Sequence, residues 1–368
     1  RATSKEGTPD MLDYWARRKG IQLLGTGDFT HPGWRALLQE MLEPAEEGLY
    51  RLKEEYRKPT QGIQGPDPRF LVTGEISCIY KKNGRVRKLH HLILLPSLQA
   101  AQELSLRLET LGNLHSDGRP ILGLDSRDLL EITLECCPSA VFIPAHIWTP
   151  HFSLFGAFSG FDSLQECFED LSGEIHALET GLSSDPAMNW QISALDSYTL
   201  VSNSDAHSPA KLGREANLLS TALSYGDVAD AIQGRNPQGF AGTIEFFPEE
   251  GKYHYDGHRN CNLRLTPQQC EELQGRCPVC GKRLTIGVQH RVDQLSDRPA
   301  GFRPQGAKPF ERLVPLPEVI GASTGCSASG KKVQLQYEAM LQELGSEFEI
   351  LRSIPLEEIG RVAGPCVE

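Results

Sequence analysis

Segments of two kinds alternate along the chain up to about residue 246. Runs with the hydrophobic spacing of amphipathic helices are separated by short apolar runs that resemble buried strands. This alternation predicts an α/β domain, and the many short apolar strands favour a closed barrel. We expect helices near 9–20, 34–41, 97–112, 126–136, 163–171 and 226–234, and strands near 21–24, 140–145, 174–179, 198–202 and 241–246.

A hairpin is predicted between two β-rich runs, 69–80 and 85–95, because the Asn83-Gly84 dipeptide between them favours a tight turn. Beyond it the composition changes: residues 251–290 are polar, lack clear periodicity and hold four of the ten cysteines. A Pro/Gly-rich joint at 299–309 precedes an amphipathic helix predicted at 330–345. We therefore expect three units: an α/β domain at 1–247, a cysteine segment at 248–298, and a linker with a C-terminal helical segment at 299–368.

Composition limits the partners and the compartment. The 368 residues include 37 Lys and Arg and 48 Asp and Glu, so the net charge of −11 does not favour nucleic acid unless a local patch or metal ions bind phosphate. No apolar run approaches the roughly 20 residues that cross a bilayer, and no signal peptide is visible. Ten cysteines in such a chain do not indicate a disulfide framework. We expect a cytoplasmic protein with some cysteines on metal.

Histidines and carboxylates fall at the ends of the predicted strands, where a parallel barrel would bring them to one mouth. Imidazole with carboxylate binds zinc, manganese or iron, and a carboxylate between two ions supports phosphoester hydrolysis. Each histidine alone fits a hydrogen-bonded core or loop residue, but their joint placement favours a metal site. The residues concerned are His31, Glu75, His90, His91, His146, Asp205 and His207.

The cysteine segment has the ligand spacing of a zinc ribbon. His258 and Cys261 form one pair, and Cys277 and Cys280, within a Cys-Pro-Val-Cys-Gly motif, form the other. Four such ligands close a tetrahedral structural zinc site, which would stabilise a segment too polar to form a core. The alternative, free thiols, is disfavoured by the spacing. Cys270 is a spare candidate that we leave out because it falls in a predicted helix start.

Several motifs together resemble the PHP (polymerase and histidinol phosphatase) metallophosphoesterases and, within them, the endonuclease Q branch. Residues 179–189 and 211–217 look specific to that branch, and the resemblance spans almost the whole chain. It implies a distorted (β/α)7 barrel that holds up to three divalent metal ions (zinc, manganese or magnesium), together with the ribbon and the C-terminal helical segment. The motifs are Gly-Thr-Gly-Asp-Phe-Thr-His at 25–31, Thr-Gly-Glu at 73–75, His90-His91, Pro-Ala-His at 144–146 and Ser-Asn-Ser-Asp-Ala-His at 202–207.

The resemblance also implies how the metals would be held. Glu75 would bridge two ions, and His146 would complete one of them with His90, which we prefer to His91 because alternate strand residues face opposite sides. Asp205 would bind another ion. His31 and His207 would share the third ion. The expected catalytic residues are Glu75, Asp205 and His207.

Two departures from the family pattern affect these expectations. The usual motif at the first strand end is Asp-His, whereas His31 here follows Asp28 by three residues, so either could be the ligand. Family members also begin with a strand carrying His-x-His, and this chain begins with residues that resemble the sequence just after it. We therefore expect a fragment that lacks the first strand and three ligands and stops short at the C-terminus, which puts its full activity in question.

Two groups of residues beside the predicted site are candidate substrate contacts. Phe152 and Phe155 lie in a Gly/Ser-rich loop, where aromatic rings could stack on bases or simply cover the barrel mouth. Lys211 and Arg214 follow the Ser-Asn-Ser-Asp-Ala-His motif and could bind phosphate or belong to a solvated helix start.

Three functions compete. The first is a metal-dependent DNA endonuclease that resembles endonuclease Q and cuts 5′ of deaminated bases (hypoxanthine, uracil, xanthine) or abasic sites in DNA repair, so its partner would be DNA with such lesions. The second is a phosphatase for a small phosphomonoester, which the negative charge favours and the ribbon and C-terminal helix disfavour. The third is a non-catalytic, zinc-stabilised DNA-binding protein, which the absent His-x-His favours.

Overall fold

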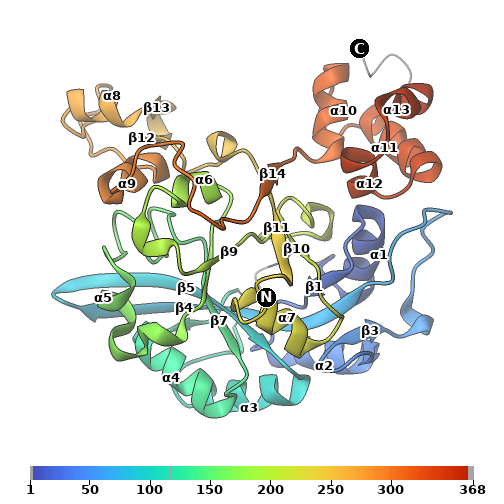
Figure 1. Ribbon diagram of the computed structural model, residues 1–368, viewed down its shortest axis with the longest axis horizontal. Coiled ribbons are helices and arrows are strands. Elements are labelled where there is room, and N and C mark those ends of the chain that lie inside the picture. The colour runs from blue at the N-terminus through green and yellow to red at the C-terminus, as the bar shows by residue number, and fades with distance from the viewer. Residues whose placement is uncertain (1–2, 117, 364–368) are drawn as a thin grey trace.

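The computed structural model describes residues 3–116 and 118–363, and it shows a mixed α/β fold built around one large sheet (Figure 1). The order of its strands is β2-β3-β4-β5-β7, and β1 and β6 also pair with β4. The strands of this sheet are β1 (Leu23–Gly25), β2 (Leu42–Pro44), β3 (Tyr50–Leu52), β4 (Arg69–Lys82), β5 (Arg85–Leu95), β6 (Ile121–Leu122) and β7 (Val141–Pro144).

Three smaller sheets complete the strands. The parallel pair β8–β9 and the sheet β10-β11-β14 follow the large sheet along the chain, and the β12–β13 pair belongs to the cysteine segment. The expected closed barrel is not seen, because the described strands form four separate sheets with no shared ladder between β7 and β8. The strands are β8 (Ala177–Glu179), β9 (Thr199–Val201), β10 (Ala216–Leu219), β11 (Phe240–Glu245), β12 (Asp256–His258), β13 (Leu263–Leu265) and β14 (Phe310–Arg312).

Apart from the short α6, which was not predicted, the helices of the α/β region form where the sequence predicted them. In α3, for example, Leu98, Ala101, Leu104 and Leu108 recur every three or four residues and are all buried, while Ser97 caps the helix by accepting from Ala100 N–H. No helix in the described part of the chain has the length and apolarity to cross a membrane. The helices are α1 (Pro9–Lys19), α2 (Pro32–Met41), α3 (Leu98–Glu109), α4 (Ser126–Cys136), α5 (Leu164–Phe168), α6 (Pro186–Asn189) and α7 (Tyr225–Ile232).

The predicted hairpin is confirmed as the antiparallel pair β4–β5, a long ribbon that extends beyond the rest of the sheet (Figure 1). Its pairing is continuous from Val72↔Leu95 to Lys82↔Arg85. The turn residues Asn83 and Gly84 have φ of 53° and 72°. Two successive positive φ values characterise the tight hairpin turn that Asn-Gly favours.

Two further groups of helices follow the α/β region. The helix α9 places Val288 and Val292 in the main hydrophobic core, so it anchors the cysteine segment to the large domain. The four C-terminal helices enclose a separate apolar cluster that includes Tyr337 and Met340. These helices are α8 (Pro267–Glu272), α9 (Val288–Leu295), α10 (Leu316–Thr324), α11 (Lys331–Leu344), α12 (Glu347–Arg352) and α13 (Leu356–Ala363).

A buried ion pair joins the C-terminal helices to α1. Lys19 Nζ lies 2.5 Å from Glu347 Oε2, and both side chains are only 4% exposed. The same carboxylate accepts hydrogen bonds from the Tyr337 hydroxyl at 2.6 Å and from Leu316 N–H at 3.0 Å. Glu347 is thus fully surrounded by donors, which is the condition for a buried charge to be tolerated.

We expect Lys19→Met to lower the free energy of unfolding by about 3–5 kcal/mol, because it leaves the Glu347 carboxylate buried without its counter-charge. Urea unfolding followed by circular dichroism would measure the loss. The double variant Lys19→Met/Glu347→Gln removes both charges and should recover part of the stability. A single variant as stable as the wild type would contradict this account of the interface.

Candidate metal centre and active site

Glu75, His90 and His146 converge on one point, and their ligand atoms all lie within 4.8 Å of one another. Glu75 Oε1 is 3.0 Å from His90 Nδ1 and 3.3 Å from His146 Nε2, and these two nitrogens are 3.1 Å apart. Three elements contribute: β4, β5 and the loop after β7. One carboxylate and two imidazoles make a donor set suited to a divalent transition metal.

The hairpin register decides which histidine takes part. His90 pairs with Ser77, two residues from Glu75, whereas His91 pairs with Ile76 on the opposite face. His91 is fully buried, with Nε2 at 2.8 Å from Ser126 Oγ. The structure therefore turns His90, and not His91, toward Glu75.

The charges in the site are linked. Burial disfavours the charged form of Glu75, but hydrogen bonds with His146 and His90 outweigh it and hold the pKa of Glu75 well below its usual range. Burial lowers the pKa of His90 to about 4, so this imidazole is neutral at pH 7 and keeps a lone pair. Burial also disfavours the charged form of His146, but the hydrogen bond to Glu75 and the charge of that carboxylate outweigh burial, so the pKa of His146 is raised.

His146 is held by its neighbours in an unusual backbone conformation, with φ of 31°. Its N–H donates to Glu179 Oε2 at 2.8 Å, and its Nδ1 lies 3.0 Å from Thr149 Oγ1, so Nε2 points to Glu75. Asn203 Nδ2 donates to the other oxygen of Glu179, also at 2.8 Å. Glu179 thus joins the loops after β7 and β9, and burial raises the pKa of Glu179 to about 7.

Arg119 is a site residue that the sequence reasoning missed. Its Nη2 donates to Glu75 Oε2 at 2.8 Å and lies 4.0 Å from Asp205 Oδ1, and its Nη1 is 3.5 Å from His90 Nε2. The guanidinium thereby balances the two carboxylates. Arg119 stands alone in an irregular segment just before β6, so no periodicity or motif marked it.

The other predicted metal ligands lie around this group rather than in it. Asp205 lies in the loop after β9 and faces the site, where its Oδ1 is 4.0 Å from Arg119 Nη2. Burial together with the Glu75 charge raises the pKa of Asp205. His207 is exposed, with Nδ1 at 2.8 Å from the Asp205 carbonyl oxygen. His31 is the N-cap of α2, where its side chain accepts from Trp34 N–H.

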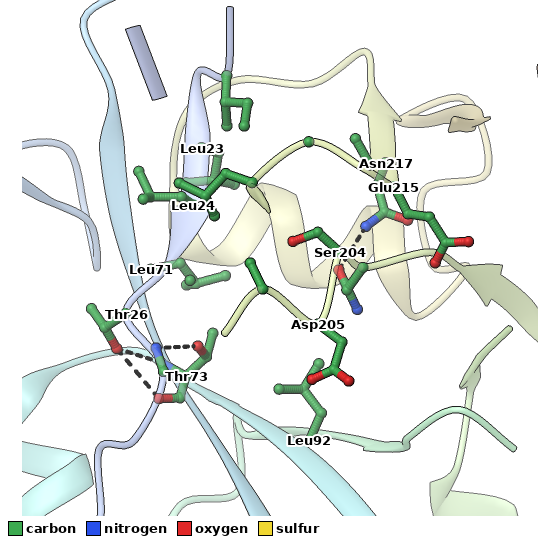
Figure 2. A pocket seen from close by; sticks show the side chains of 18 of the residues that line it. Leu23, Leu24, Thr26, Leu71, Thr73, Leu92, Ser204, Asp205, Glu215 and Asn217 are labelled. Carbon is green, nitrogen blue, oxygen red and sulfur yellow. Dashed lines mark hydrogen bonds between the residues drawn. The ribbon is translucent and has the colours of Figure 1, made fainter. Parts of the chain in front are cut away.

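A cavity of about 760 Å³ opens beside these residues. Glu75, Arg119 and Asp205 line its polar part, and aliphatic side chains from several strands line the remainder. Figure 2 shows Leu23, Leu24 and Leu71 on one side of it, Glu215 and Asn217 on the other, and Asp205 between them. The candidate site therefore has room for a ligand larger than a metal ion.

The structure brings the four predicted zinc ligands together. The ligand atoms of His258, Cys261, Cys277 and Cys280 all lie within 4.8 Å of one another, with Cys280 Sγ at 3.5 Å from His258 Nδ1. They come from β12, the turn after it and the loop after α8. Four donors of this kind at one point suit a tetrahedral zinc ion.

A second buried group in the same region combines Asp256, Cys270 and His290. Asp256 Oδ1 accepts from Gly287 N–H at 2.6 Å, and its Oδ2 lies 2.6 Å from His290 Nδ1. Because both carboxylate oxygens already have partners, this group serves as a hydrogen-bonded link between β12 and α9.

The predicted substrate contacts differ in how they are placed. Phe152 lies against His90, with ring centroids 4.8 Å apart, whereas Phe155 is 3% exposed and packs on Trp148 in the core. Lys211 is exposed but faces Glu318 of α10 at 3.4 Å, and the Arg214 guanidinium lies 5.9 Å from the Phe246 ring centroid. Of the two aromatics, only Phe152 borders the site.

We expect Gly181→Ala to disturb His146 directly. Gly181 has φ of +72°, and an added Cβ would lie 2.6 Å from His146 Cβ. Affinity for Mn²⁺, measured by isothermal titration calorimetry, should fall about tenfold or more, as when groups that orient a metal ligand are lost. Gly84→Ala is the matched control, since Gly84 has the same φ and a Cβ added there would meet no other residue within 4 Å. Equal Mn²⁺ affinities in the two variants would contradict the prediction.

A protein-family model, the MJ0043 C-terminal domain, matches residues 315–367. The chain is 29% identical over 357 residues to the uncharacterized protein YqxK of Bacillus subtilis (strain 168), covering 95% of this chain and 83% of that protein. It is 30% identical over 226 residues to the uncharacterized protein MJ0043 of Methanocaldococcus jannaschii, covering 58% of this chain but only 27% of that protein.

Two solved structures resemble the whole described fold. One is the lesion-specific endonuclease PfuEndoQ from Pyrococcus furiosus, with 30% identity, a TM-score of 0.84, and coverage of 100% of this chain and 86% of that chain. The other is endonuclease Q in complex with a 27-mer duplex that has an abasic lesion at the active site, with 30% identity, a TM-score of 0.86, and coverage of 100% and 87%. With this identity across nearly the whole of both proteins, the chain belongs to the endonuclease Q family.

Proposed function

We propose that this protein is a metal-dependent DNA endonuclease that cuts the phosphodiester 5′ of deaminated bases or abasic sites in DNA repair. The observation that carries the proposal is the convergence of Glu75, His90 and His146, with Asp205 close by, beside an open cavity. The substrate class is supported by the solved endonuclease Q complex, which holds a duplex with an abasic lesion. Hypoxanthine, uracil and xanthine are the deaminated bases we expect it to recognise.

The residues of the site suit this chemistry. Divalent ions held by Glu75, His90, His146 and Asp205 would supply Lewis-acid stabilisation of the phosphate and activation of water. Neutral His90 and deprotonated Glu75 are ready to coordinate at neutral pH. Glu179 and Thr149 fix the orientation of His146.

The fold expectations enter the same proposal. We infer that the large sheet, the β8–β9 pair and the β10–β11 ladder are arcs of a distorted PHP-type barrel spanning 1–247, because the ends of β7, β8 and β9 all meet at the site. Residues 248–298 would form a zinc-ribbon unit and 299–368 a linker with a helical unit. Separate apolar clusters around Cys270 and around Tyr337 support this division.

We expect the protein to nick duplexes that contain deoxyuridine, deoxyinosine or an abasic site in the presence of Mn²⁺ or Mg²⁺, and to leave an undamaged duplex intact. Asp205→Asn should lower kcat by about a hundredfold or more, because it removes a charged metal donor. Denaturing gels of end-labelled strands would measure the rates. Asp230→Asn, which removes an exposed carboxylate that pairs with Arg235 at 2.6 Å, is the control.

Other outcomes of this assay would point elsewhere. Turnover of a small phosphomonoester without nicking of any duplex would favour a phosphatase. Lesion-selective binding with neither reaction would favour a non-catalytic DNA-binding protein. Either result would overturn the proposed endonuclease.

We further propose one structural zinc ion at His258, Cys261, Cys277 and Cys280, because the four ligand atoms cluster in a segment with little core of its own. Cys280→Ser should lower the zinc content by one equivalent and make 248–298 sensitive to protease, measured by plasma mass spectrometry and limited proteolysis. Cys326→Ser is the matched control, since Cys326 lies in the C-terminal helical unit and is only half-buried. An unchanged zinc content in the Cys280 variant would refute the site.

A further inference from the structure

The tip of the β4–β5 hairpin concentrates positive charge in a chain whose net charge is −11. Two of its basic side chains are used inside the protein. Lys82 lies 3.1 Å from Asp125 and 2.7 Å from Glu169, and Arg87 is buried over the Phe161 ring. The other three form no ion pair within the described residues: they are Lys81, Arg85 and Lys88.

The strand register places these three cations on two faces. Lys88 pairs with Ile79 and Lys81 pairs with Val86, so both share the face of Glu75 and His90. Lys88 is two residues beyond His90, hence about 7 Å further along the strand. Arg85, paired with Lys82, belongs to the opposite face.

Aromatic rings lie beside Lys88. The Phe152 ring covers His90 at 4.8 Å, and Lys88 Nζ lies 5.4 Å from the centroid of the same ring. Next to it, His151 and Phe158 stack with centroids 4.9 Å apart, and Phe158 is 39% exposed.

Hydrogen bonds fix this aromatic loop to the hairpin. Phe152 N–H donates to Ser159 Oγ at 3.2 Å, and Ser159 Oγ donates to the Lys88 carbonyl oxygen at 3.2 Å. Phe152 itself has φ of 60°, an uncommon conformation that these bonds maintain. The rings and the cations therefore form one connected surface that begins at His90.

We propose that this surface, formed by Lys81, Lys88, Phe152, His151 and Phe158 and here named the hairpin track, binds one arm of the DNA as it leaves the active site. Unpaired lysines neutralise phosphates, and neighbouring rings stack on bases or pack against sugars. An anionic strand fits better than an acidic protein because Lys88 lies against the Phe152 ring and the same ring covers His90 of the candidate site. The inference rests on the proposed endonuclease function and specifies the surface along which one arm of its DNA substrate lies.

The test compares Lys81→Ala/Lys88→Ala with Arg85→Ala, which removes a cation from the opposite face of the same hairpin. Binding of a fluorescent duplex with an abasic site is followed by anisotropy at several KCl concentrations, and nicking is followed at saturating DNA. The double variant should bind about tenfold more weakly, and the slope of log affinity against log salt should become smaller by about two. Its kcat should stay at the wild-type value, and Arg85→Ala should behave as wild type.

Shortening the duplex on each side of the lesion locates the track. Wild-type affinity should fall when one particular arm is shortened, and the double variant should be insensitive to that arm. The hairpin track is refuted if the double variant binds as the wild type does, or if Arg85→Ala weakens binding equally. If the wild type binds but nicks no damaged duplex, the endonuclease proposal fails while the binding comparison still decides the track.

Discussion

A carboxylate inside a β-strand is the constraint on which the site depends. Glu75 lies among apolar residues of β4, where an unpaired charge would be costly, and it remains ionised because His90, His146 and Arg119 all contact it. Each partner comes from a different part of the chain. The strand pairing of β4 with β5, the path of the chain after β7 and the irregular segment before β6 must therefore all be correct for this one charge to be satisfied.

A second carboxylate, that of Glu179, fixes the loops that surround Glu75. Glu179 receives His146 N–H with one oxygen and Asn203 with the other, and Asn203 is in turn bonded to Asn217 at 3.0 Å. This chain of hydrogen bonds ties the loop after β7 to the end of β8, to the loop after β9 and to β10, and these strands belong to three separate sheets. Side-chain hydrogen bonds at the strand ends thus connect sheets that share no backbone ladder. They explain how the site residues are held together although no closed barrel is seen.

Sequence patterns predicted correctly those features that depend on residues close together in the chain. The Asn83-Gly84 turn, the long hairpin and the capped helices follow from backbone preferences, and pairs such as Cys277 and Cys280 are close because they are close in sequence. The long-range features were harder to predict. Arg119 carries no pattern, the burial of Phe155 depends on its packing against Trp148, and the break between β7 and β8 depends on pairing that periodicity does not encode.

The position of Arg119 has a consequence for the binding of any cation at this site. Its guanidinium already provides positive charge to Glu75 and Asp205, so the chain itself compensates these two carboxylates. A divalent ion held by Glu75 would compete with Arg119 for the same carboxylate, and the guanidinium would have to give up its bond to Glu75 Oε2. In that competition a doubly charged ion would be favoured over a singly charged one, because its Coulomb attraction to the carboxylate is larger.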